Sequence, residues 1–275
     1  MKKTKIYLLF ILTWLLIVIV YILLPVQTIK KEDFNLYYSE VNTQRVISST
    51  AQVTIFNNEK IYLCTAFAYK REGNLYYFAT AAHCVADMDD ENKNIIKRYD
   101  NVMLQISDDL NNSEKDSYIA EVVGVGYEPV GDDFAILTAT IDKYIPLLDF
   151  SGIEPMLGNC VLNVSFPAKS DGNIFMGYIT NINYQIDIES KSIIYHTVVA
   201  KLFGIEIAGG ASGSALVSCS SAKVYGVVVA STGNEVSLVA IPVQKFIDFE
   251  QKIIKKEYLY KLMPKEPGFC PIDEK

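Results

Sequence analysis

The chain has 275 residues and half of them are hydrophobic, so it can bury one substantial core or two smaller ones. This composition argues against intrinsic disorder. Its net charge of -7 provides no basic surface for neutralising phosphates, which argues against a nucleic-acid-binding protein.

The N-terminal region predicts a membrane anchor. Ile6 to Leu24 is an uncharged apolar run followed by Pro25, and a helix over such a run nearly spans the roughly 30 Å hydrocarbon core. A cleaved secretory signal is the alternative, but its apolar part is usually only about 7–15 residues long and precedes a small-residue cleavage site that this sequence lacks. Three lysines within residues 1–5 favour a cytoplasmic N-terminus.

We therefore expect a single-pass membrane protein. Residues 1–5 are predicted to be cytoplasmic, 6–25 to form the transmembrane helix, 26–45 to form a polar stalk, and 46–275 to lie outside the cytoplasm.

Residues 46–150 are predicted to form a first β-barrel. They contain six short apolar runs bounded by glycine, asparagine, aspartate or charged residues, a pattern typical of strands. Two strongly charged stretches, 87–99 and 107–116, are predicted to be surface loops. The expected strands are 51–56, 61–69, 75–81, 101–106, 119–127 and 134–140.

Residues 151–242 are predicted to form a second barrel, and 243–262 a helix. Phe246, Phe249 and Ile253 lie near helical spacing, and Pro264 follows. The expected fold class is thus all-β: two six-stranded antiparallel β-barrels with a C-terminal helix and tail (243–275), preceded by one transmembrane helix. The expected strands of this barrel are 159–166, 174–186, 192–200, 214–219, 223–230 and 236–242.

Three motifs carry the candidate chemistry: TAAHC at 80–84, DFAIL at 133–137 and GGASGSAL at 209–216. An imidazole can take the proton of a serine hydroxyl while a carboxylate holds the ring, which makes the hydroxyl a nucleophile. The candidate residues are His83, Asp133 and Ser212, and their presence together favours a hydrolase.

These motifs, in the order His, Asp, Ser, resemble the chymotrypsin/trypsin-like serine protease family over roughly residues 46–262. The order differs from that of α/β-hydrolases, where serine comes first. The strings VYGVVV at 224–229 and AIPV at 240–243 are similar to the bacterial HtrA branch. The resemblance implies two barrels with the active site between them.

The resemblance also implies a role for each residue. Ser212 is expected to attack a carbonyl carbon, His83 to accept the serine proton, and Asp133 to orient the imidazole. Asp133 is preferred over Asp132 because it begins the acid-hydrophobe-Ala-hydrophobe-Leu pattern of the family. The backbone N–H groups of Gly210 and Ser212 are expected to form the oxyanion hole.

The five cysteines are informative because exported thiols tend to pair. The resemblance implies disulfides between Cys64 and Cys84 and between Cys160 and Cys219. Cys270 is then expected to be unpaired within the chain. Five free, mostly buried thiols are the alternative.

One departure and two specificity candidates complete the comparison with the family. Ala211 stands where aspartate commonly precedes the nucleophile, so activation by a newly cleaved N-terminus is not expected. Glu206 occupies a position that often forms the base of the first specificity pocket, where a carboxylate favours lysine or arginine. His196 could reach the cleft, although a lone strand histidine is more often structural.

The resemblance implies a protein or peptide substrate and neither a metal nor an organic cofactor. The expected function is therefore that of a serine endopeptidase. An inactive module that binds peptides by strand addition is the first alternative to this function. An esterase that uses the same residues is the second. The sequence does not specify an oligomeric state.

Overall fold

The computed structural model describes residues 14, 40–57, 60–89, 94–110, 115–126, 132–150, 154–167, 172–187, 194–203, 209–232 and 237–254. The chain divides into two units, Met1–Asp33 and Phe34–Lys275, and the second contains the fold considered below. Of the predicted membrane segment 6–25, only Trp14 is among the described residues. Within the described residues, no helix is long and apolar enough to cross a bilayer.

Six antiparallel strands close the first barrel in the order β1-β2-β3-β8-β7-β6. In β6, Val102, Leu104 and Ile106 are buried and the residues between them are partly exposed, as expected for a strand with one face toward the barrel core. The strands are β1 (Thr50–Asn57), β2 (Lys60–Glu72), β3 (Leu75–Thr80), β6 (Val102–Ile106), β7 (Asp116–Val125) and β8 (Ala135–Thr140).

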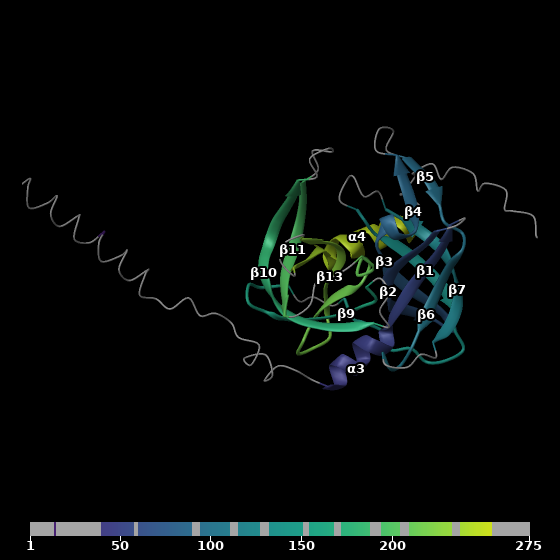
Figure 1. The fold of residues 1–275 in the computed structure, drawn as a ribbon, viewed down its shortest axis with the longest axis horizontal. Coiled ribbons are helices and arrows are strands. Elements are labelled where there is room, and N and C mark those ends of the chain that lie inside the picture. The colour runs from purple at the N-terminus through teal and green to yellow at the C-terminus, as the bar shows by residue number, and fades with distance from the viewer. Residues whose placement is uncertain are drawn as a thin grey trace, which may run out of the picture. The chain divides into compact units, whose positions relative to one another are not determined.

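Six further strands close the second barrel in the order β10-β11-β14-β13-β12-β9, and helix α4 (Val243–Ile254) follows. Figure 1 shows this green barrel beside the blue-to-teal first barrel. Both predicted six-stranded barrels and the C-terminal helix are thereby confirmed. The strands are β9 (Cys160–Ser165), β10 (Asn173–Asp187), β11 (Ile194–Phe203), β12 (Ala215–Ser218), β13 (Val224–Thr232) and β14 (Ser237–Pro242).

A separate two-stranded sheet lies within the stretch 87–99 that was predicted to be a loop. Strands β4 (Ala86–Asp89) and β5 (Asn94–Arg98) pair antiparallel. Their residues are mostly polar, so no hydrophobic alternation marked them as strands. The loop prediction was therefore wrong for these two segments.

Helix α3 (Glu40–Ser49) begins within the segment predicted to be a stalk. It connects both barrels: Asn42 Nδ2 donates to the Cys219 carbonyl oxygen at 3.2 Å, and Arg45 Nε donates to the Leu147 carbonyl oxygen at 3.1 Å. Val46, a residue of this helix, is fully buried. Because only one short face of this helix is apolar, the sequence pattern did not reveal it.

One hydrophobic cluster joins the barrels. It combines Phe67 and Phe134 of the first barrel with Val217 of the second and with Phe246 and Phe249 of α4. All five side chains are fully buried. Removing this apolar surface from water holds the two barrels against each other, so the residues at their junction have defined positions.

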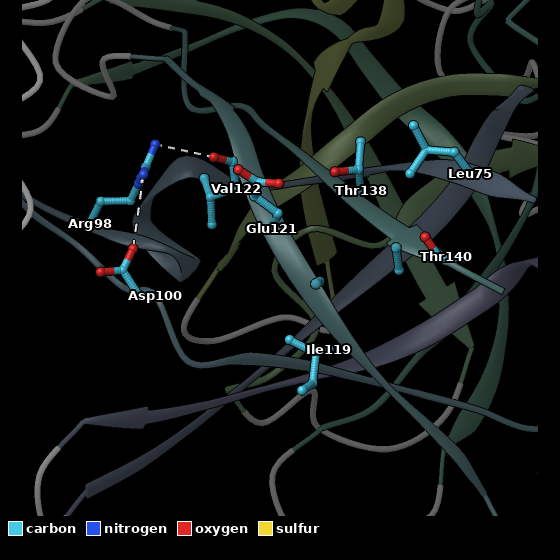
Figure 2. A pocket seen from close by; sticks show the side chains of 10 residues that line it. Leu75, Arg98, Asp100, Ile119, Glu121, Val122, Thr138 and Thr140 are labelled. Carbon is cyan, nitrogen blue, oxygen red and sulfur yellow. Dashed lines mark hydrogen bonds and ion pairs between the residues drawn. The ribbon is translucent and has the colours of Figure 1, made fainter. Parts of the chain in front are cut away.

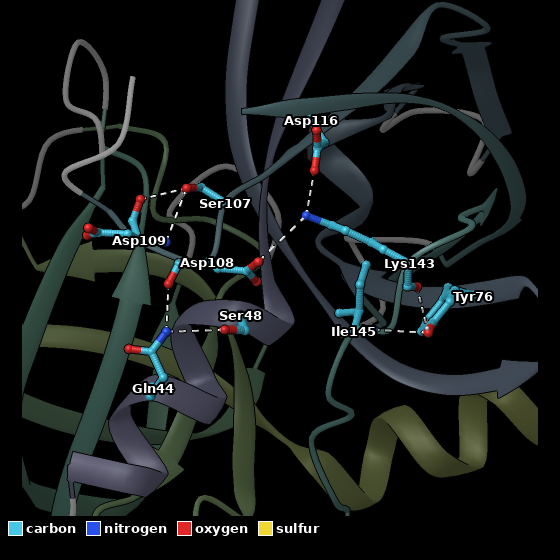
Figure 3. A network of polar contacts seen from close by, with 9 residues as sticks. All are labelled: Gln44, Ser48, Tyr76, Ser107, Asp108, Asp109, Asp116, Lys143 and Ile145. Atoms are coloured by element: carbon cyan, nitrogen blue, oxygen red, sulfur yellow. Dashed lines mark hydrogen bonds and ion pairs between the residues drawn. The ribbon is translucent and has the colours of Figure 1, made fainter. Parts of the chain in front are cut away.

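A polar network fixes the segment that leaves β8 (Figure 3). The Tyr76 hydroxyl donates to the Lys143 carbonyl oxygen at 3.2 Å and accepts the Ile145 N–H at 3.0 Å. The Lys143 ammonium lies 2.6 Å from Asp116 Oδ2. Burial lowers the pKa of Lys143, but its hydrogen bond with Asp116 and the charge of Asp108 outweigh this effect and raise the pKa overall.

We expect Tyr76→Phe to lower the free energy of unfolding by about 1–3 kcal/mol, because the buried Ile145 N–H loses its acceptor. Tyr77→Phe is the matched control: its hydroxyl contacts Glu72 at the surface, so a change within about 0.5 kcal/mol is expected. Urea unfolding followed by circular dichroism measures both. Equal losses in the two variants would contradict the role assigned to Tyr76.

Candidate active site

His83 lies on a short 3-10 turn, η1 (Ala82–Cys84), that directly follows β3. The turn is closed by the Val85 N–H, which donates to the Ala82 carbonyl oxygen at 3.0 Å. Ala82 and Cys84 are buried, whereas the His83 side chain is 33% exposed. The small alanines allow the turn to enter the barrel core, and the imidazole is the side chain of the turn that reaches the surface.

Asp133 lies against His83 because β3 and β8 are paired. Thr80 faces Ala135 in this pair, so the turn after β3 and the residues before β8 meet at the same end of the barrel. Asp133 Oδ2 lies 2.7 Å from His83 Nδ1, and Oδ1 accepts the His83 backbone N–H at 3.0 Å. The Asp133 side chain is only 4% exposed, and these two contacts offset the free-energy cost of burying its carboxylate.

This geometry determines what the imidazole can do. With the Asp133 carboxyl group at Nδ1, we assign the ring proton to that nitrogen, which leaves Nε2 as the basic atom. The two hydrogen bonds restrict both the ring and its backbone. This geometry would allow His83 to act as a general base while Asp133 orients its ring.

Ser212 lies in the turn between the described Gly209 and β12, and this turn is bound to the first barrel. The Thr65 N–H donates to the Ser212 carbonyl oxygen at 2.9 Å, and Thr65 Oγ1 donates to the Gly210 carbonyl oxygen at 2.8 Å. Gly213 has φ +85°, and a Cβ there would lie 2.1 Å from the Thr65 carbonyl oxygen. Glycine is therefore required where the two barrels approach this closely.

The disulfide between Cys64 and Cys84 joins the histidine turn to β2, next to Thr65, which binds the serine turn. Cys84 Sγ lies 3.8 Å from the Ser212 carbonyl oxygen. An imidazole nitrogen of His83 and both sulfur atoms lie within 4.8 Å of one another. This spacing could suit a metal ion, but sulfurs bonded to each other have no thiolate to donate. Thus His83 and Ser212 share Cys84 as a neighbour.

Two backbone amides of the serine turn are available to a ligand. Gly210 has φ +112°, a conformation that favours glycine. In the part of the chain that the structure describes, neither the Gly210 N–H nor the Ser212 N–H has an acceptor. Such a pair of donors can bind an oxygen that gains negative charge during a reaction.

A buried polar network supports the serine turn, and sequence reasoning missed it. Asn163 Nδ2 donates to Ser214 Oγ at 2.8 Å and to the Ala215 carbonyl oxygen at 2.9 Å. Ser214 Oγ donates to the Ala211 carbonyl oxygen at 2.7 Å. The signal was present in the sequence: Asn163 is a polar residue between the apolar Leu162 and Val164, where a hydrogen-bonding role is expected.

The structure describes only some of the remaining predicted residues. Cys160 and Cys219 form a disulfide, so both pairs implied by the family resemblance are present. His196 lies on β11 with its backbone opposite Gln185, and its side chain is outside the described residues. Glu206 and Cys270 also lie outside the described residues.

A separate hollow of about 320 Å³ lies at the opposite end of the β3–β8 pair (Figure 2). Leu75 and Thr140 face each other there, five residues along β3 from Thr80, which is roughly 16 Å at the rise of a strand. Its lining contains Arg98 and Asp100 but none of the candidate catalytic residues. This hollow is therefore distinct from the candidate active site.

Comparisons with known proteins identify a family. A family model described as a trypsin-like peptidase domain matches residues 64–227. Among solved structures, the active form of the Rv3671c protease from M. tuberculosis has a TM-score of 0.60 and 18% identity, covering 77% of this chain and 83% of its own. No curated protein matches the chain.

Two further solved structures share the fold. The serine endoprotease from Yersinia pestis has a TM-score of 0.57 and 17% identity, covering 78% of this chain and 66% of its own. The HtrA-type protease AlgW with tripeptide has a TM-score of 0.59 and 20% identity, covering 78% and 63%. The chain therefore spans just under two thirds of these two proteins, one of which belongs to the HtrA type suggested by the sequence.

The two disulfides allow a matched test of the histidine turn. Their sequence separations of 20 and 59 residues predict that removal costs about 3 kcal/mol for Cys64–Cys84 and about 4 kcal/mol for Cys160–Cys219. We expect Cys64→Ala/Cys84→Ala, but not Cys160→Ala/Cys219→Ala, to accelerate hydrogen exchange of residues 80–85 at a temperature where both variants are folded. Unchanged protection in the first variant would contradict the assigned role of this bridge.

Proposed function

The chain belongs to the trypsin-like peptidase family, and we propose that it is a serine endopeptidase with Ser212 as its nucleophile. The observation that carries the proposal is the His83–Asp133 pair, in which one buried carboxylate binds both the ring and the backbone of the histidine. A pair of this geometry next to a serine turn is what acyl transfer requires.

In the proposed first half-reaction, Ser212 Oγ bonds to the carbonyl carbon of a peptide and its proton moves to His83 Nε2. The carbonyl oxygen becomes an oxyanion that the N–H groups of Gly210 and Ser212 stabilise. Collapse of this intermediate breaks the C–N bond, and His83 protonates the departing amine. The product is an ester between the substrate acyl group and Ser212.

Water completes the proposed cycle. His83 takes a proton from water, whose oxygen attacks the ester carbon, and a second oxyanion forms at the same amides. Collapse returns the proton to Ser212 Oγ and releases a carboxylic acid. Asp133 is proposed to stabilise the imidazolium in both halves. The scheme thus uses four residues, Ser212, His83, Asp133 and Gly210.

We further propose that the peptidase domain lies outside the cytoplasm, anchored by the apolar run 6–25 with the N-terminus cytoplasmic. Two disulfides support this location, because such bonds persist in oxidising compartments. The substrate is proposed to be protein or peptide. A preference for lysine or arginine through Glu206 remains a prediction from the sequence.

A fluorophosphonate probe followed by peptide mass mapping tests this function. We expect one label, on Ser212, that disappears in Ser212→Ala and is strongly reduced in His83→Ala. Ser212→Ala should also lower kcat for peptide hydrolysis by at least about 10⁴-fold. Ser117→Ala is the control, because Ser117 is exposed on β7 of the first barrel.

Two outcomes would contradict the proposal. Absence of label on folded wild-type protein would favour the inactive peptide-binding module. Labelling of Ser212 with turnover of esters but not of peptides would favour the esterase.

A further inference from the structure

We propose that helix α4 is a positioning element for Asp133, and that Phe249 and Phe246 hold the acid in place through Phe134. This inference rests on the proposed function, because it concerns the orienting carboxylate of that mechanism. It assigns to the C-terminal helix a role in the chemistry of the first barrel, although the helix directly follows the last strand of the second barrel.

The backbone around Asp133 forms a tight turn. The Phe134 N–H donates to the Asp132 carbonyl oxygen at 2.7 Å, which closes a three-residue turn with Asp133 at its centre. The Gly126 N–H donates to the Phe134 carbonyl oxygen at 2.7 Å. A Cβ at Gly126 would lie 1.9 Å from the Asp132 carbonyl oxygen, so the neighbouring strand contacts the turn closely.

The side chain that follows the acid anchors this turn in α4. Phe134 is fully buried, and its ring centre lies 5.4 Å from that of Phe246 in an edge-to-face arrangement and 5.8 Å from that of Phe249. Consecutive Cα atoms are only about 3.8 Å apart. A shift of the Phe134 ring therefore moves the adjacent carboxylate of Asp133 relative to His83.

Three further contacts hold α4 against the first barrel. The Tyr69 hydroxyl donates to Glu250 Oε1 at 3.0 Å. Burial, supported by the charge of Glu250, raises the pKa of Tyr69, so the hydroxyl remains a donor. Lys252 Nζ lies 4.0 Å from Asp132 Oδ2. The Ile253 side chain covers Gly124, where an added Cβ would lie 3.1 Å from it.

These contacts lead to a specific expectation. Loss of the Phe249 ring leaves a cavity under Phe134, so the acid turn can move while the serine turn and its contacts with Thr65 remain. Misplacement of a catalytic group by about 1 Å can lower the rate about 100-fold. We expect Phe249→Ala to lower kcat for peptide hydrolysis by about 10- to 100-fold with KM changed less than about twofold, and Phe249→Leu to restore most of the rate.

Leu104→Ala is the matched control in the full-length chain. Leu104 is also fully buried, but it lies on β6, which pairs with β1 and β7 and not with β8. Its truncation leaves a comparable core cavity away from the acid turn. We expect its kcat to equal that of wild type at a temperature where both proteins are folded.

A second readout does not require turnover. The chain has two histidines, so the Nδ1–H proton of His83 can be assigned by nuclear magnetic resonance with His196→Gln as reference. We expect the signal of this hydrogen-bonded proton in wild type and Leu104→Ala, and its loss in Phe249→Ala. If wild type shows the signal but no peptidase activity, and Phe249→Ala loses the signal, the positioning role is supported while the proposed function is refuted.

Gly126→Ala provides a route to the same answer if Phe249→Ala does not fold. Its Cβ would overlap the Asp132 carbonyl oxygen and displace the acid turn directly. We expect loss of the Nδ1–H signal and a fall in kcat. The proposal is overturned if Phe249→Ala keeps both signal and kcat, or if Leu104→Ala loses them equally. When Phe249→Ala is unfolded, an unchanged signal in Gly126→Ala overturns it.

Discussion

The docking of the serine turn on Thr65 is the contact on which the rest of the site depends. Thr65 is fully buried in the first barrel, yet its N–H and its hydroxyl both bind carbonyl oxygens of the turn that carries Ser212. Its hydroxyl also accepts the Phe166 N–H, and its carbonyl oxygen accepts the Thr80 hydroxyl. One residue thus joins the serine turn to the strand that leads to His83. Breaking these hydrogen bonds would leave buried donors and acceptors without partners, at a cost in free energy. The bonds therefore restrict movement of the two barrels relative to each other.

The serine turn is held by neutral hydrogen bonds from Asn163 and Ser214, and the residue before the nucleophile is the buried Ala211. Alanine has no carboxylate that could form an ion pair with an N-terminus created by cleavage. The residues that precede the first barrel, Arg45 and Val46 among them, are part of helix α3. The geometry of the turn therefore depends on packing between intact elements of the chain.

The sequence allowed the parts of the site to be predicted, because they are local. Short apolar runs bounded by turn-forming or charged residues predicted both barrels. Single motifs identified His83 and Asp133, which the β3–β8 pairing brings together. The contributions of Thr65 and α4 could not be predicted, because each acts through contacts between segments far apart in the chain. For Asn163, the sequence indicated a hydrogen-bonding role but not its partners in the serine turn. An apolar helix face predicts that the face is buried but not which residues it packs against. Nothing in the sequence showed that Phe249 packs on Phe134. The β4–β5 hairpin was missed because its polar residues carry no alternation.

The central claim is that packing of the two barrels brings His83, Asp133 and Ser212 together as one reactive group. A crystal structure of the protein after reaction with a fluorophosphonate tests it most directly. The account predicts phosphorus on Ser212 Oγ, one phosphoryl oxygen within hydrogen-bonding distance of the Gly210 and Ser212 amides, and His83 Nε2 beside the adduct with Asp133 still at Nδ1. An adduct on another residue, or a Ser212 adduct with the imidazole out of reach, would contradict it.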